Sequence, residues 1–108
     1  MEEKYIYYNN LFDIYSELLT VKEKETFSLY YQEDLSLSEI ADNNNISKSA
    51  VGKMIKNILE KLDNYEALLK IYNTRKKILE LLKEDNIEHL KKGIEDLKKE
   101  LERWLIIS

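Results

Sequence analysis

The chain has 108 residues, of which 44% are hydrophobic and 35% are charged, so it is long enough for one small domain with a core. It has no cysteine, no proline and two glycines, which excludes a disulfide framework, a thiolate metal site and a turn-rich β-protein. Its net charge of -4 opposes indiscriminate nucleic-acid binding, so any such binding needs a local basic face. We therefore expect an all-α protein.

Two capping signatures divide the first part of the chain into short helices. Apolar spacing predicts a first helix over about 5–19. Thr20 and Glu23 then match a capping box, in which a hydroxyl caps the helix and a carboxylate reaches back, and Ser36 and Glu39 repeat the pattern. A second and a third helix should therefore begin directly after Thr20 and Ser36.

A run of asparagines, Asn43–Asn45, is the best turn signal in the sequence. Asparagine tolerates the left-handed conformation that a tight helix exit requires, and we expect Asn45 to adopt it. Ile46 should anchor the turn in the core, and Ser47 should cap a fourth helix. Nothing breaks the apolar periodicity of this helix strongly before about Lys83, so we expect one long helix, or two that meet at Asp63–Asn64.

The last segment, which starts at Asp85–Asn86, has the spacing of a coiled-coil seam. Its apolar residues step alternately by three and four positions, and they are Ile87, Leu90, Ile94, Leu97, Leu101 and Trp104. We predict that this seam forms a homodimer interface; the alternative is that it packs back on the chain's own helices. We treat residues 1–108 as a single helical domain, with a core at about 11–62 and a C-terminal helical extension at about 63–108.

The segment 37–56 has the spacing of a helix-turn-helix, within a three-helical core of winged-helix type that lacks a sheet. Small Ala41 would allow the two helices to cross closely, and Val51 would bury the inner face of the second one. The outward residues near the start of that second helix are the predicted nucleic-acid-binding set: Lys48, Ser49, Gly52, Lys53 and Lys56. From Ser47 to Ile58 there are three lysines and no acidic residue, so the helix is locally positive.

Two features favour the alternative, an antiparallel helical pair with a solvated lysine face. Gly52 weakens the middle of the proposed reading helix. The start of that helix also lacks Arg, Gln and Asn, the side chains suited to bidentate contacts with bases.

The sequence resembles the YlxM family, small bacterial proteins similar to sigma-factor region 4. The resemblance covers about residues 11–84, and its most specific block is Tyr30-Tyr31-x-x-Asp34-Leu35-Ser36-Leu37-x-Glu39-Ile40-Ala41. It also includes Leu11-Phe12-Asp13-x-Tyr15-x-x-Leu18-Leu19-Thr20, Ile46-Ser47-x-x-Ala50-Val51, Ile55-Lys56 and Tyr65-Glu66-x-x-Leu69. The resemblance implies a role in the signal recognition particle pathway, in which the family has been placed by gene neighbourhood.

Two functions remain open at this stage. One is a dimeric, non-enzymatic regulator that binds nucleic acid, with DNA expected and RNA as the alternative. The other is a protein-interaction module that docks on the particle, its GTPase or its RNA without binding DNA. No cofactor or metal motif is present, and the single histidine, His89, is expected to be solvated rather than catalytic.

Eight tyrosines stand out in the composition, most of them in the first third of the chain. Tyrosines at helical spacing usually bury the ring and leave the hydroxyl in water, which favours packing at the edge of the core. An aromatic interface with a partner is the alternative. No apolar run approaches the roughly 18 residues of a membrane span, and we expect a cytoplasmic protein.

Overall fold

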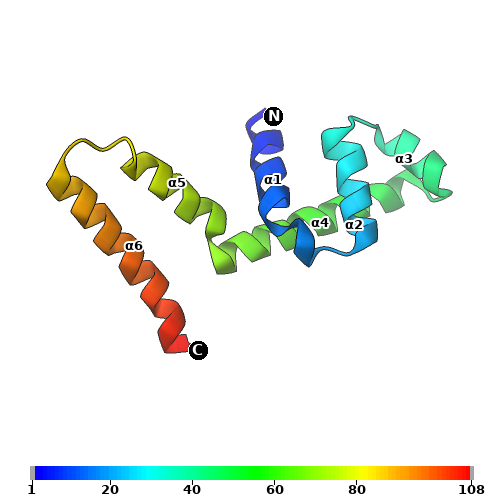
Figure 1. The fold of residues 1–108 in the computed structure, drawn as a ribbon. Coiled ribbons are helices and arrows are strands. Elements are labelled where there is room, and N and C mark those ends of the chain that lie inside the picture. The colour runs from blue at the N-terminus through cyan, green and yellow to red at the C-terminus, as the bar shows by residue number, and fades with distance from the viewer. Residues whose placement is uncertain (1, 108) are drawn as a thin grey trace. The chain divides into compact units, whose positions relative to one another are not determined.

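A computed structural model describes the backbone of residues 2–107 and the side chains of residues 2–102, and this part of the chain contains helices and no strand (Figure 1). The prediction of an all-α fold is therefore confirmed. In chain order the elements are α1 (Glu2–Tyr15), the 3-10 helix η1 (Ser16–Leu18), α2 (Val21–Phe27), the π-helix η2 (Ser28–Gln32), α3 (Leu37–Asn44), α4 (Lys48–Leu69), α5 (Ile71–Leu81) and α6 (Ile87–Ile107).

Residue contacts divide the chain into two compact units, an N-terminal unit, Met1–Lys70, and a C-terminal unit, Ile71–Ser108. The N-terminal unit holds α1 to α4 and the C-terminal unit holds α5 and α6. The single domain inferred from the sequence stays a prediction.

Both predicted capping boxes are present in the N-terminal unit. The Thr20 hydroxyl accepts a hydrogen bond from the Glu23 backbone at 3.1 Å, and the Glu23 carboxylate accepts one from the Thr20 backbone at 2.9 Å. Ser36 and Glu39 form the same reciprocal pair, with both bonds at 3.1 Å. These side chains satisfy backbone donors that the first turn of a helix leaves open, so they set where α2 and α3 begin.

Helix α4 is the element against which the rest of the N-terminal unit packs, since α1, α2 and α3 all contact it. Its buried side chains are spaced by four and three residues, as an amphipathic helix requires: Val51, Ile55, Ile58 and Leu62. Opposite them lie the buried residues of the other helices, among them Leu11, Tyr15, Phe27, Ile40 and Ala41. Ala41 is buried on α3, which contacts α4, as its small size predicts.

Stacked aromatic rings join α1 to α2 and η2. The ring of Phe27 lies parallel to that of Phe12, with centroids 4.3 Å apart, and parallel to that of Tyr31 at 4.6 Å. The ring of Tyr5 meets Tyr31 at 4.7 Å, and burial raises the pKa of Tyr31 to about 12. Offset aromatic pairs add stability beyond the area that they bury. These ring contacts favour packing at the edge of the core for Tyr5 and Tyr31.

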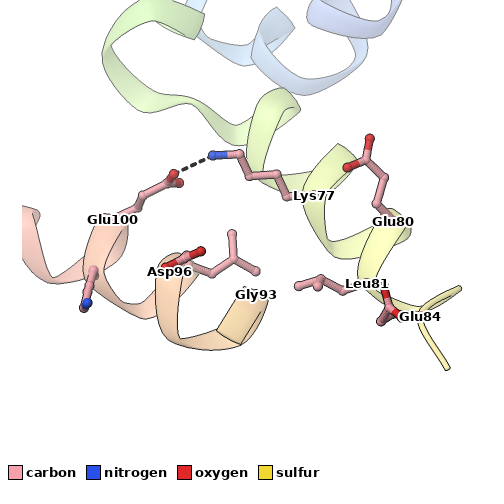
Figure 2. A pocket seen from close by; sticks show the side chains of 9 residues that line it. Lys77, Glu80, Leu81, Glu84, Gly93, Asp96 and Glu100 are labelled. Atoms are coloured by element: carbon pink, nitrogen blue, oxygen red, sulfur yellow. Dashed lines mark hydrogen bonds and ion pairs between the residues drawn. The ribbon is translucent and has the colours of Figure 1, made fainter. Parts of the chain in front are cut away.

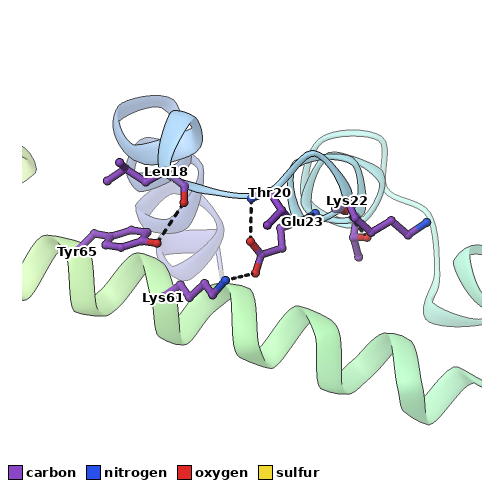
Figure 3. A network of polar contacts seen from close by, with 7 residues as sticks. Leu18, Thr20, Lys22, Glu23, Lys61 and Tyr65 are labelled. Carbon is purple, nitrogen blue, oxygen red and sulfur yellow. Dashed lines mark hydrogen bonds and ion pairs between the residues drawn. The ribbon is translucent and has the colours of Figure 1, made fainter.

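Further polar contacts hold the segment between α1 and α2, and the start of α2, against α4 (Figure 3). Tyr65 donates its hydroxyl proton to the Leu18 carbonyl at 3.2 Å, and Lys61 forms an ion pair with Glu23 at 2.6 Å. The same Glu23 carboxylate closes the capping box of α2, so one side chain ties the start of α2 to the middle of α4.

The predicted break at Asp63–Asn64 is wrong, because α4 continues without interruption to Leu69. The Tyr8 hydroxyl donates to the Asp63 carboxylate at 2.8 Å and that of Tyr15 donates to Glu66 at 2.7 Å, which holds this stretch of α4 against α1. The helix ends instead at Lys70, whose φ of 55° is left-handed and whose N–H reaches the Glu66 carbonyl.

The C-terminal unit is a pair of helices, α5 and α6, that contact each other. The side-chain oxygen of Asn86 accepts a hydrogen bond from the His89 backbone at 3.1 Å and caps α6. Within the described residues, neither α5 nor α6 carries a buried side chain. His89 is exposed, and its ring lies 3.9 Å from the Glu84 carboxylate.

Along the described part of the chain, no helix combines the length and the apolar character needed to cross a membrane. The same residues contain no group of three or more His, Cys, Asp or Glu side chains arranged to hold a metal ion.

Candidate nucleic-acid interface

The turn between α3 and α4 has the geometry that the asparagine run predicts. Asn45 has a φ of 54° and a ψ of 40°, in the left-handed region, and its N–H donates to the Ala41 carbonyl. The Ile46 N–H donates to the same carbonyl at 3.1 Å. The Ser47 hydroxyl then accepts a hydrogen bond from the Ala50 N–H at 3.1 Å, so α4 starts at Lys48 with a satisfied cap.

One expectation for this turn is wrong: Ile46 does not anchor it in the core. The side chain is 39% exposed. Ile40 and Val51 are almost completely buried where α3 meets α4, so they already fill the core beside the turn. Ile46 is therefore left at the rim of the helix-turn-helix.

The predicted site residues lie on one face of the first turns of α4, because steps of four residues return to the same side of a helix. Lys48, Ser49, Lys53 and Lys56 are exposed, and Gly52 is partly buried between them. In the part of the chain that the structure describes, none of the three lysines forms an ion pair with an acidic side chain. Their charge is therefore directed to solvent.

The helix terminus adds to this positive charge, since the open N–H groups of a first turn carry the positive end of the helix dipole. Helix α4 has no acidic residue in its first turn. The positive surface is short, however. Glu60 and Asp63 follow farther along α4, and Glu39 and Asp42 are exposed on α3. The basic face therefore covers only the N-terminal part of α4.

A groove of about 430 Å³ runs beside this basic face. Gly52 and Lys56 of α4 line it together with Leu37 of α3 and Tyr30 and Tyr31 of η2. A Cβ added at Gly52 would make only an ordinary contact of 3.9 Å with Leu37. Packing inside the chain therefore does not require a glycine here, and its effect is to leave the groove open.

Two lysines of this region do not stand out in the sequence. Lys22 of α2 donates to the Asn44 side chain at 2.6 Å, next to the turn of the helix-turn-helix. Lys4 of α1 lines the same groove as Lys56. Both residues are distant from the motif along the chain, and only the tertiary fold brings them to it.

The fold and this geometry define a helix-turn-helix protein with an exposed basic second helix. Comparison with known families agrees: residues 2–102 match the UPF0122 family, described as "Putative helix-turn-helix protein, YlxM / p13 like". The chain belongs to this family, which confirms the resemblance found in the sequence.

Curated relatives extend the match over most of the chain. A UPF0122 protein of Fusobacterium nucleatum is 41% identical over 99 residues, which is 88% of this chain and 96% of the relative. One of Bacillus pumilus is 46% identical over 81 residues, which is 75% of this chain and 74% of the relative. One of Clostridium kluyveri is 43% identical over 96 residues, which is 89% of this chain and 78% of the relative.

Proposed function

We propose that this protein is a regulator that binds nucleic acid, DNA above all, through the N-terminal face of α4. The observation that carries the proposal is the exposure of Lys48, Lys53 and Lys56, without acidic partners in the described structure, at the start of the second helix of a helix-turn-helix. In this fold the start of the second helix enters the major groove, while the first helix crosses the backbone. Membership of a helix-turn-helix family supports the same function.

The expected interaction is modest and depends on salt. Each lysine can neutralise about one phosphate, and the released counterions make binding weaken as salt rises. Ser49 is the polar side chain of this face that can contact a base edge, and serine discriminates weakly between bases. We therefore expect the phosphate contacts, rather than base readout, to provide most of the affinity.

Charge reversal tests the proposal directly. In fluorescence anisotropy with labelled duplex DNA, the double substitution Lys48→Glu with Lys53→Glu should abolish binding, because both changes repel phosphates at the same face. The matched control is Lys91→Glu with Lys92→Glu, which changes the net charge equally on exposed positions of α6. Equal loss in both double variants, or full binding by the first, would contradict the proposal.

We place the regulatory output in the signal recognition particle pathway, as the resemblance to the YlxM family implies. A pull-down of particle components with the tagged protein, with and without nuclease, tests this placement. Recovery of the particle's GTPase or RNA is the expected result. Recovery of neither would remove the protein from this pathway while leaving DNA binding open.

A second function, protein docking without DNA binding, is favoured by the groove beside α4. Charged residues lie at its edge, but its lining also includes Leu37, Gly52 and three tyrosines, and this apolar part suits an apolar side chain of a partner protein. Gly52→Leu would fill the groove and leave the lysines in place. Loss of nuclease-resistant recovery in this variant, with no DNA binding by the natural chain, would favour docking over the regulator.

A further inference from the structure

The C-terminal unit exposes an unusual amount of apolar surface for a pair of helices. Seven large aliphatic side chains of this unit are each about half exposed or more. One of them, Leu79, is 52% exposed and lies apart from the others; the other six are Ile71 47%, Ile78 45%, Leu82 77%, Ile87 69%, Ile94 54% and Leu101 57%. No side chain of this unit is buried among the described residues, so the described parts of the two helices enclose no core. Two-helix pairs of this kind need a further apolar surface to be stable.

The predicted seam of α6 is divided between two sides of the helix. Leu90 and Leu97 are partly buried, whereas Ile87, Ile94 and Leu101 remain largely exposed. The exposed three recur at intervals of seven residues, and two of them, Ile94 and Leu101, line a shallow groove of about 480 Å³ together with Leu97. The side chain of Trp104, the last residue of the predicted seam, lies outside the described residues.

The contacts between α5 and α6 fix which way the exposed residues point. Gly93 of α6 lies against Leu81 of α5, so closely that a Cβ at position 93 would collide with the leucine, and Lys77 pairs with Glu100 (Figure 2). These two pairs run in opposite order along the chain, so the helices are antiparallel.

Four of the exposed apolar residues directly follow a residue of this contact. Ile78 follows Lys77 on α5 and Leu82 follows Leu81 at its end, while Ile94 follows Gly93 and Leu101 follows Glu100 on α6. One residue advances a helix by about 100°. Viewed from one end, the chain turns clockwise in one of two antiparallel helices and anticlockwise in the other. Starting from contact residues that face each other, the next residue therefore lies on the same side of the pair in both helices. These four side chains therefore share one side of the pair, and Ile71 and Ile87, seven residues before Ile78 and Ile94, extend it to an apolar face of six side chains.

The opposite side of the pair is polar. It holds a pocket of about 570 Å³, and most of the residues that line this pocket are charged, among them Glu80 and Asp96 (Figure 2). The C-terminal unit thus has one face suited to water and one that is not.

We propose that the apolar face binds the same face of a second copy of the chain, so that two α5–α6 pairs form a four-helix bundle. The seven-residue spacing on both helices, Ile71 to Ile78 and Ile87 to Ile94 to Leu101, is the repeat with which helices of a bundle interlock. A twofold dimer needs a self-complementary patch, and a flat aliphatic face meets this requirement. This interface includes α5 and therefore differs from a two-stranded coiled coil of α6.

The exposed area agrees with a dimer of this kind. The six side chains expose on the order of 600 Å² per chain, so pairing would remove about 1,200 Å², the lower end of the range for specific interfaces. The proposal does not depend on nucleic-acid binding. Its tests use nuclease-treated protein at high salt, where contacts through phosphates are screened.

Sedimentation equilibrium of the full chain gives the first test. We expect about twice the monomer mass of 12.9 kDa. Ile94→Glu should raise the dissociation constant roughly a hundredfold or more, because it places a charge in an apolar contact. Lys92→Glu changes an exposed residue of the same helix away from the apolar face, and it should leave the dimer intact. A monomeric natural chain, or a dimer that resists Ile94→Glu, would overturn the proposal.

Cross-linking keeps the test valid if Ile94→Glu unfolds the α5–α6 pair. The chain has no cysteine, so a single introduced one reports one position. Lys98 lines the apolar groove, and Lys98→Cys should yield covalent dimers with a flexible bis-maleimide reagent. Lys92→Cys should yield several-fold fewer. Equal yields from the two variants, or none from Lys98→Cys, would contradict the proposed face.

Discussion

The two units of this chain differ in what stabilises them. In the N-terminal unit, one side of α4 is fully buried and includes Leu62. Leu11 and Phe27 pack in the same core. In the C-terminal unit, helices of similar amphipathic pattern meet and leave most of their described aliphatic side chains exposed. An amphipathic pattern therefore predicts that one face of a helix will be buried, but only the tertiary structure shows which element buries it.

This difference suggests a separate task for each unit. Because the N-terminal unit is completed by its own contacts, the outward face of α4 is free to bind a partner. The C-terminal unit lacks a core of its own among the described residues, so we assign to it the task of self-association. Two reading helices on one dimer would double the phosphate contacts, as paired half-sites do in other helix-turn-helix proteins.

The largest expected effect contrasts core residues of the two units. Phe27→Ala should lower the free energy of unfolding of the N-terminal unit by about 3–5 kcal/mol, because it opens a cavity in a fully buried cluster. Leu101→Ala, at a side chain that is 57% exposed, should cost the isolated chain little and instead weaken self-association. Denaturant unfolding followed by circular dichroism measures the first effect, and sedimentation equilibrium measures the second. Equal losses in the two variants would contradict the contrast.

Helix caps give a smaller effect with the same contrast. Thr20→Ala should destabilise the N-terminal unit by about 1 kcal/mol, since it removes one half of a capping box next to the Lys61–Glu23 ion pair. Asn86→Ala removes the cap of α6, and its effect should be limited to the helicity of the C-terminal unit. Thermal unfolding checks both, and a lower melting temperature of the N-terminal unit in Asn86→Ala would show that the units are coupled.

The two glycines should respond differently to alanine. Gly52→Ala should stabilise the N-terminal unit by up to about 1 kcal/mol, because alanine favours the helix and its Cβ has room beside Leu37. Gly93→Ala should gain less or lose stability, because Leu81 occupies the space of the new Cβ and must move. Chemical denaturation of both variants measures the difference, and a larger gain at position 93 would contradict the described contact.

Acid should weaken the N-terminal unit through its capping boxes. Burial tends to raise the pKa of Glu23, but hydrogen bonds from Lys61 and Thr20 outweigh it and hold the pKa below 4.5; the Ser36 backbone lowers the pKa of Glu39 in the same way. A carboxylate with a lowered folded pKa stabilises the protein above its unfolded pKa, and this stabilisation is lost as pH falls through the folded value. The free energy of unfolding should therefore decline below about pH 4.5, and less steeply in Glu23→Gln.

The local features of the fold follow from the sequence because they depend on neighbours along the chain. Both capping boxes, the left-handed Asn45 and the Ser47 cap are read from residues within four positions of each other. The misplaced break at Asp63–Asn64 and the exposed Ile46 depend on distant partners instead. Tyr8, 55 residues away, binds Asp63, and no local pattern predicts it.

The candidate site shows the same limit. The spacing of the motif predicts that Lys48, Lys53 and Lys56 share a face, since this is a property of one helix. The groove beside Gly52 depends on α1, η2, α3 and α4 together, so the sequence indicates only that the glycine weakens the helix. The sequence also does not predict that Leu81 lies close to Gly93, because this contact joins residues of two different helices.

The most direct test of the proposed function is the salt dependence of binding to duplex DNA. If Lys48, Lys53 and Lys56 each neutralise about one phosphate, the logarithm of the binding constant should fall with the logarithm of salt concentration with a slope of roughly -3 per protomer and about -6 for a dimer. The slope should shrink in single Lys→Gln variants of α4 and stay unchanged in Lys92→Gln. No binding at low salt, or a slope that does not respond to the α4 lysines, would contradict the account.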